Sequence, residues 1–146
     1  MKKYKHVLVA IDVSNEADAL LQQAKQIAQA FNCKLSVLHV CEPIPAVLGE
    51  YLTLELPIGT KTLQDHVKNR LCKLTHDQGM PPEDVHIVHG RTAEEVVTHA
   101  DNYHVDLIIT GSHTRKGLQR LLGSTANEIL HKANCDVMTL KIREHD

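Results

Sequence analysis

The segment ITGSHTRKGLQRLLGSTANEIL, residues 109–130, contains groups that could hold an anion. It has a glycine at Gly111, continues through a basic turn, and reaches Gly123, Ser124 and Thr125 where a helical pattern begins. Amide hydrogens at the start of a helix favour a negative charge, because the helix dipole is positive there. From the spacing alone, these residues fit a phosphate site and a plain helix cap equally well.

Two familiar phosphate motifs are absent from the sequence. A P-loop requires G-x-x-x-x-G-K-[ST], but Gly117 is followed by Leu118. A dinucleotide fingerprint requires G-x-G-x-x-G after the first strand, where this chain has AIDVSNEA. Asp12 in that stretch would repel phosphate, so it suits a ribose hydroxyl or an adenine edge better. His113 and Arg115 in the basic turn could contact phosphate, although loop side chains of these types are also commonly solvated.

The strands and helices that would position these residues are predicted from apolar runs, which alternate with segments of helical period. The runs are 6–11, 35–40, 85–88, 105–110 and 137–142, and the helical patterns are 17–31, 63–74, 93–100 and 126–133. Ser14 precedes the first helix, and Thr92 with Glu95 matches a capping box before the third. This alternation predicts an α/β fold, a Rossmann-like open sheet of five parallel strands with helices on both faces.

The proportion of apolar residues in each predicted strand predicts the order of the strands in the sheet. The first and fourth runs are the most continuously apolar, as expected of central strands, whereas the third and fifth mix in polar residues, as edge strands do. The resulting order is 3-2-1-4-5, which reverses direction between the first and fourth strands. Open α/β sheets bind ligands beside such a switch point. We therefore expect Asp12 and Thr110–Gly111 to lie at one edge of the sheet.

Length and charge restrict the class of protein. A chain of 146 residues fits a single domain, residues 1–146. The formal net charge of -2 provides no basic field for nucleic acid or an anionic membrane, so neither is expected as a partner. The apolar run after the basic start is too short for a signal peptide or a membrane span, which favours a cytoplasmic protein.

Cysteines and histidines raise the question of a metal or a disulfide. The cysteines have no C-x-x-C spacing and are expected to be buried free thiols: Cys33, Cys41, Cys72 and Cys135. Among the 11 histidines, His86 and His89 would point to opposite faces of a strand, and no H-E-x-x-H occurs. No metal site is expected.

Residues 41–59 interrupt the alternation of strands and helices. The segment contains Pro43, Pro45 and Pro57 and has no clean period. Connections of this length are often lids or binding loops, although a variable surface excursion is the simpler interpretation.

Taken together, four segments resemble the universal stress protein family, in its short single-domain type close to universal stress protein A. They are KHVLVAIDVSNEADALLQQA, LSVLHV, DLIITGSHTRKGLQRLLGSTANEIL and CDVMTLKI, so the resemblance covers essentially the whole chain. It implies the α/β fold described above, a homodimer in which the last strands pair across the two-fold axis, and a role in surviving stress.

The resemblance also implies a nucleotide site. Nucleotide-binding members carry G-x-x-G followed, after nine residues, by G-[ST], and this loop holds the phosphates. Asp12 and its neighbours would meet adenine or ribose, Val40 the adenine edge, and the loop the phosphates. The implied nucleotide-binding residues are Ala10, Ile11, Asp12, Val40, Thr110, Gly111, His113, Arg115, Gly123, Ser124 and Thr125. This chain departs from the pattern at Thr114, which replaces the second glycine, and its loop is one residue shorter.

Three functions remain as alternatives. The first is a cytoplasmic homodimeric stress protein that binds AMP or ATP as a regulatory ligand, with no required cofactor and no catalytic residue. The second is a nucleotide-independent dimer that acts through protein contacts, which Thr114 and the short loop favour. The third, a slow ATPase, is disfavoured because phosphoryl transfer needs a carboxylate near the β- and γ-phosphates, whereas Asp12 is expected at the sugar end.

Overall fold

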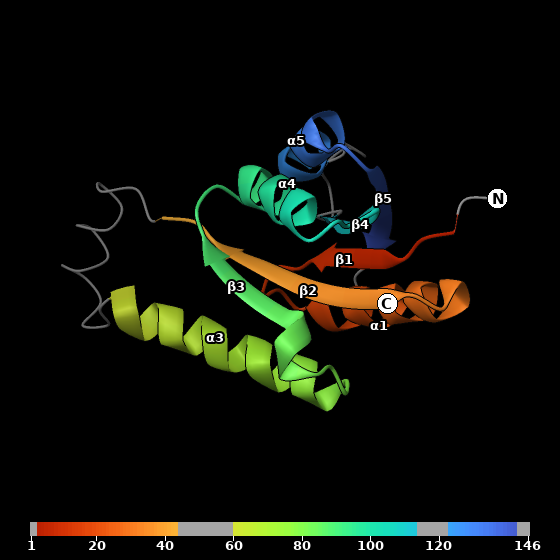
Figure 1. The fold of residues 1–146 in the computed structure, drawn as a ribbon. Helices are drawn as coiled ribbons and strands as arrows, with labels where there is room; N and C mark the ends of the chain where they lie inside the picture. The colour runs from red at the N-terminus through yellow and green to blue at the C-terminus, as the bar shows by residue number, and fades with distance from the viewer. Residues whose placement is uncertain (1–2, 44–59, 114–122, 143–146) are drawn as a thin grey trace.

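The sheet has the predicted order and direction. The computed structural model describes residues 3–43, 60–113 and 123–142 (Figure 1). Within them, five strands form one sheet in the order β3-β2-β1-β4-β5, and all four neighbouring pairs are parallel. The strands are β1 (His6–Ala10), β2 (Lys34–Cys41), β3 (Val85–His89), β4 (Leu107–His113) and β5 (Asp136–Ile142). The predicted edge positions of β3 and β5 are therefore confirmed.

Helices cover both faces of this sheet. They are α1 (Ala17–Phe31), α3 (Thr60–Asp77), α4 (Thr92–Asn102) and α5 (Ser124–Lys132), and a short 3-10 helix, η1 (Pro82–Asp84), precedes β3. Figure 1 shows α1 and α3 on one side of the sheet and α4 and α5 on the other. Each side has its own apolar core, because alternate residues of β1 point to opposite faces: Val7 and Val9 pack with α1, and Leu8 packs with α4 and α5.

The predicted capping box at Thr92 is wrong. Helix α4 begins at Thr92, its N-cap is Arg91, and the Arg91 side chain makes no capping hydrogen bond. The Thr92 hydroxyl instead donates to Oε1 of Glu42 at 2.7 Å, and the Thr92 amide donates to the same oxygen at 3.2 Å. The physical reason is tertiary, because the end of β2 brings a carboxylate to the start of α4.

The cysteines are free as predicted, but the prediction that they are buried is wrong. Cys33, Cys41 and Cys135 are partly exposed, and Cys72 is exposed on α3 beside the fully buried Leu71. Partial burial is enough to raise the pKa of the Cys33 and Cys41 thiols.

The residues that the structure describes form neither a candidate metal cluster nor a candidate membrane span. Within them, no group of three or more His, Cys, Asp or Glu residues is placed to hold a metal ion. None of the helices in residues 3–43, 60–113 and 123–142 combines the length and apolar character needed to cross a bilayer. Of the irregular 41–59 segment, residues 44–59 lie outside the described part of the chain.

Candidate functional site

A cavity of about 350 Å³ lies at the carboxyl ends of β1, β2 and β4, beside the first turns of α4 and α5. Its volume falls in the range of roughly 300–1,000 Å³ that is typical of small-molecule sites. The sequence-predicted residues that line it are Ala10, Ile11, Asp12, Val40, Thr110, Gly111, Gly123, Ser124 and Thr125. His113 ends β4, but its side chain and all of Arg115 lie outside the described part of the chain. The structure thus brings Asp12 and Gly123 to one cavity.

The floor of the cavity is held by contacts between the ends of β1 and β2. The Ile11 amide donates to the Leu38 carbonyl at 2.9 Å, and Nδ1 of His39 lies 2.8 Å from the Ile11 carbonyl oxygen. A carbonyl oxygen can only accept, so Nδ1 of His39 carries the hydrogen. His39 is buried and lines the cavity, yet sequence reasoning missed it, because a single histidine in the apolar run LSVLHV gives no sign of its partner.

Asp12 lies two residues after the end of β1 and contributes a carboxylate to the cavity wall. Ser14 donates its hydroxyl to Oδ1 of Asp12 at 2.8 Å, which restricts the orientation of that carboxylate. A carboxylate at this place can accept hydrogen bonds from sugar hydroxyls or amino groups and repels phosphate.

The start of α5 forms the opposite part of the wall. Gly123 is its N-cap residue, and among the described residues no side chain caps this end. The amide hydrogens of the first turn have no partner inside a helix, so they can face an anion together with the hydroxyls of Ser124 and Thr125. Among the described residues, those that β4 and α5 contribute to the lining are uncharged.

The two glycines of this site differ in their surroundings. No positive φ is found at Gly111, which lies inside β4 opposite Leu140. A Cβ atom there would lie 3.2 Å from Cδ2 of Leu20, so the close packing of α1 explains the glycine. At Gly123 a Cβ atom would meet nothing within 4 Å.

The comparisons with known proteins agree on one family. The model of the universal stress protein family matches residues 3–141. The chain belongs to the universal stress protein family. This confirms the resemblance seen in the sequence and places the chain among stress-response proteins.

Individual relatives match over nearly their whole length. Universal stress protein A homolog 1 of Coxiella burnetii is 34% identical over 142 residues, which are 97% of this chain and 99% of that protein. The structure of hypothetical protein MJ0577 is similar with a TM-score of 0.72 and 27% identity, over 99% of this chain and 100% of that one. A universal stress protein in complex with cAMP has a TM-score of 0.59 and 24% identity, over 97% and 100% of the two chains.

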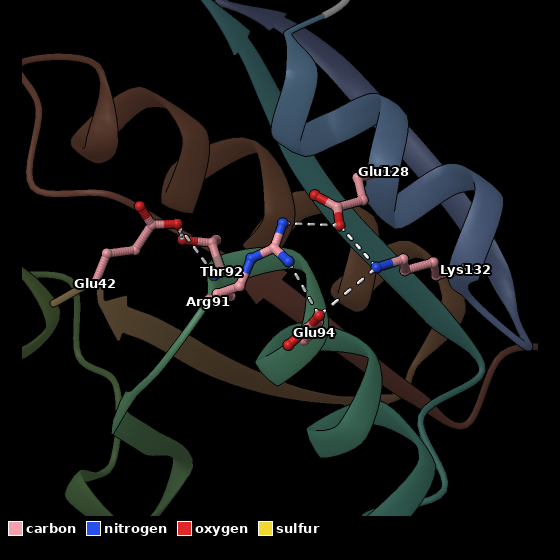
Figure 2. A network of polar contacts seen from close by, with 6 residues as sticks. All are labelled: Glu42, Arg91, Thr92, Glu94, Glu128 and Lys132. Atoms are coloured by element: carbon pink, nitrogen blue, oxygen red, sulfur yellow. Dashed lines mark hydrogen bonds and ion pairs between the residues drawn. The ribbon is translucent and has the colours of Figure 1, made fainter. Parts of the chain in front are cut away.

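In this universal stress protein, a polar network joins the start of α4 to the middle and the end of α5 (Figure 2). Arg91 lies 3.3 Å from Oε1 of Glu94 and 3.5 Å from Oε1 of Glu128. Lys132 lies 2.7 Å from the same oxygen of Glu128 and 3.8 Å from Glu94. Such exposed ion pairs each contribute little to stability, but together they link the two helices.

Glu42 and Thr92 form the part of this network that lines the cavity. The hydrogen bonds from the Thr92 hydroxyl and amide favour the ionised carboxylate and lower the pKa of Glu42. Sequence reasoning missed both residues as site residues, because Glu42 opens an irregular segment and Thr92 resembled an ordinary cap. The cavity of the universal stress protein therefore has carboxylates at the ends of β1 and β2, and amides and hydroxyls at β4 and α5.

Proposed function

We propose that the chain binds an adenine nucleotide, AMP or ATP, in this cavity as a regulatory ligand. The observation that carries the proposal is that Asp12, Val40 and the first turn of α5 line one cavity. A nucleotide has hydrogen-bond donors on its sugar and base and negative charge on its phosphates, which matches the carboxylates at one end and the amides at the other. A protein of the same fold has been solved in complex with cAMP, which is also an adenine nucleotide.

Under this proposal the ligand is bound and not turned over, and no cofactor is required. Phosphoryl transfer needs a charged group or metal ligand near the transferred phosphate. The cavity residues described on β4 and α5 are uncharged, and the two described carboxylates, Asp12 and Glu42, follow β1 and β2. The site therefore suits a protein that senses a nucleotide in the stress response, which we propose acts in the cytoplasm.

Thermal unfolding with and without AMP or ATP tests the proposal. A ligand that binds only the folded chain, at about a hundredfold excess over its Kd, adds about 2.7 kcal/mol to the free energy of unfolding. We expect a clear rise in the melting temperature with AMP or ATP and a smaller rise with adenosine, which lacks the phosphate. An unchanged melting temperature at millimolar AMP and ATP would contradict the proposal.

The same experiment on Ser124→Asp separates ligand binding from folding. An acidic residue in the first turn of α5 interacts favourably with the helix dipole, so the variant should fold at least as stably as the parent. Its carboxylate would occupy the place proposed for phosphate, so the shift with AMP should be lost. Asn127→Asp is the matched control, because Asn127 is exposed on the same helix and does not line the cavity. If both variants keep the full shift, phosphate does not bind at α5.

We further propose a homodimer through β5. This strand pairs with β4 on one side and forms the boundary of the described sheet on the other. In a two-fold pairing of identical strands, the middle residue Thr139 would lie near its own copy. Sedimentation at micromolar concentration should give twice the chain mass. Thr139→Arg should shift the chain toward the monomer, whereas Thr98→Arg, on the exposed face of α4, should not. A monomeric parent chain would contradict the proposal.

A further inference from the structure

We propose that Glu42 closes the start of α4 to anions and thereby confines a bound phosphate to the start of α5. The assignment of the α5 start to a nucleotide's phosphate rests on the proposed function. The closing of α4 rests on the geometry of Glu42 itself. Together they make Glu42 the residue that sets which way round a nucleotide lies in the cavity.

Two helices begin at the cavity, and both starts are attractive to an anion. Thr92 is the first residue of α4, Ser124 is the first residue of α5, and both line the cavity wall. Each offers an amide and a hydroxyl at the positive end of a helix dipole. By helix physics alone, a phosphate could bind at either place.

The start of α4 is already occupied by the chain's own carboxylate. Oε1 of Glu42 accepts from the Thr92 hydroxyl at 2.7 Å and from the Thr92 amide at 3.2 Å. These are the two donors that Thr92 would otherwise offer to an anion. The negative charge of Glu42 also repels a second anion, and the lowered pKa of its carboxyl keeps that charge down to acidic pH.

Two described cations beside this point, Arg91 and Lys132, are also engaged. Figure 2 shows Arg91 between Glu94 and Glu128, and Lys132 between the same two carboxylates. Neither cation is left to compensate an anion at α4. The start of α5 differs, because its N-cap residue Gly123 has no side chain and no hydrogen bond like that of Glu42 is found there among the described residues. The phosphate end of a ligand should therefore lie at α5 and its other end toward β2.

An ordinary structural cap would have the same geometry, so the test must measure anion binding as well as stability. We would titrate inorganic phosphate into the ¹⁵N-labelled full chain and follow the amide shifts of Thr92, Ser124 and Thr125. Glu42→Ala opens the start of α4, whereas Glu42→Gln keeps the size and an acceptor but removes the charge. Glu94→Ala is the matched control, because Glu94 belongs to the same network but does not line the cavity.

In the parent chain and in Glu94→Ala, phosphate should shift Ser124 and Thr125 and leave Thr92 unchanged. In Glu42→Ala a saturable shift of Thr92 should appear, and in Glu42→Gln a weaker one. If Glu42→Ala fails to fold, the response of Glu42→Gln decides. The proposal is wrong if Thr92 of the parent chain responds as strongly as Thr125, or if Thr92 stays unresponsive in the folded Glu42 variants.

The two proposals fail in different ways in this experiment. If phosphate shifts neither Ser124 nor Thr125 in any protein, the confinement of phosphate to α5 and the phosphate end of the proposed nucleotide site are both wrong. The appearance of a Thr92 shift only in the Glu42 variants would still show that Glu42 closes α4. If Ser124 and Thr125 respond and Thr92 never does, the phosphate site stands and the role of Glu42 is refuted.

Discussion

Lowering the pH from about 7 to about 4.5 should reduce the free energy of unfolding by about 2–3 kcal/mol through His99 alone. His99 on α4 is only 8% exposed. Its burial, together with the smaller effects of the neighbouring His86 and His6, lowers its pKa from 6.5 to about 4. The unfolded chain therefore takes up a proton near pH 6.5, whereas the folded chain takes it up only near pH 4. This stability is complete above pH 6.5 and is lost as the pH falls toward 4.

The surroundings of His99 explain why its ring stays neutral. It stacks on Tyr103, with ring centroids 4.4 Å apart and planes at 27°, and its centroid lies 4.8 Å from that of His86. Among the described residues, its buried Nε2 atom has no hydrogen-bond partner. Nδ1 of His6 contacts the Tyr103 carbonyl oxygen at 3.1 Å, which ties β1 to the same cluster. A positive charge placed here would find no counterion among these neighbours.

Urea unfolding at the two pH values checks this prediction. His99→Phe keeps a planar ring against Tyr103 but cannot be protonated, so its loss of stability should be smaller than that of the parent chain by about 2–3 kcal/mol. His131→Gln is the matched control, because His131 is exposed on α5. Equal pH dependence in the parent chain and in His99→Phe would show that His99 does not control this window.

Ile129→Ala should destabilise the fold by about 2–5 kcal/mol, because it leaves a void in the core. Ile129 is completely buried and packs in the core that α5 shares with Leu8, Val96 and Ile108. It also lines the cavity, so the packing of α5 and the placement of its first turn depend on the same side chain. Ile129→Val removes one methylene and should cost about 0.5–1.5 kcal/mol.

The next residue provides the control for Ile129. Leu130 is 50% exposed, so Leu130→Ala should change the free energy of unfolding by no more than about 0.5 kcal/mol. Urea unfolding of the three variants at neutral pH measures the differences. Similar losses for Ile129→Ala and Leu130→Ala would mean that α5 does not pack against the sheet through Ile129.

The sequence by itself determined the helices and strands and their layers, because the spacing of apolar residues along the chain indicates which side chains of each element are buried. Val7, Leu8 and Val9 are apolar without interruption, which is how a central strand covered on both faces must read, and β1 lies in the middle of the sheet. The alternation in β5 likewise marked an edge. The switch point between β1 and β4 followed from this order, so the place of the cavity was also predictable.

Only the tertiary structure decided which hydrogen-bond partners the polar side chains have. Thr92 and Glu42 are 50 residues apart in the sequence. The packing of α4 beside the end of β2 brings them together, so Thr92 bonds to the Glu42 carboxylate and does not form the capping box that its local pattern predicted. The pairing of β1 with β2 places His39 within hydrogen-bond distance of the Ile11 carbonyl. The glycine at position 111 is explained by the close approach of Leu20 on α1. Hydrogen bonds depend on distances of a few tenths of an ångström, and such distances exist only once the layers have packed.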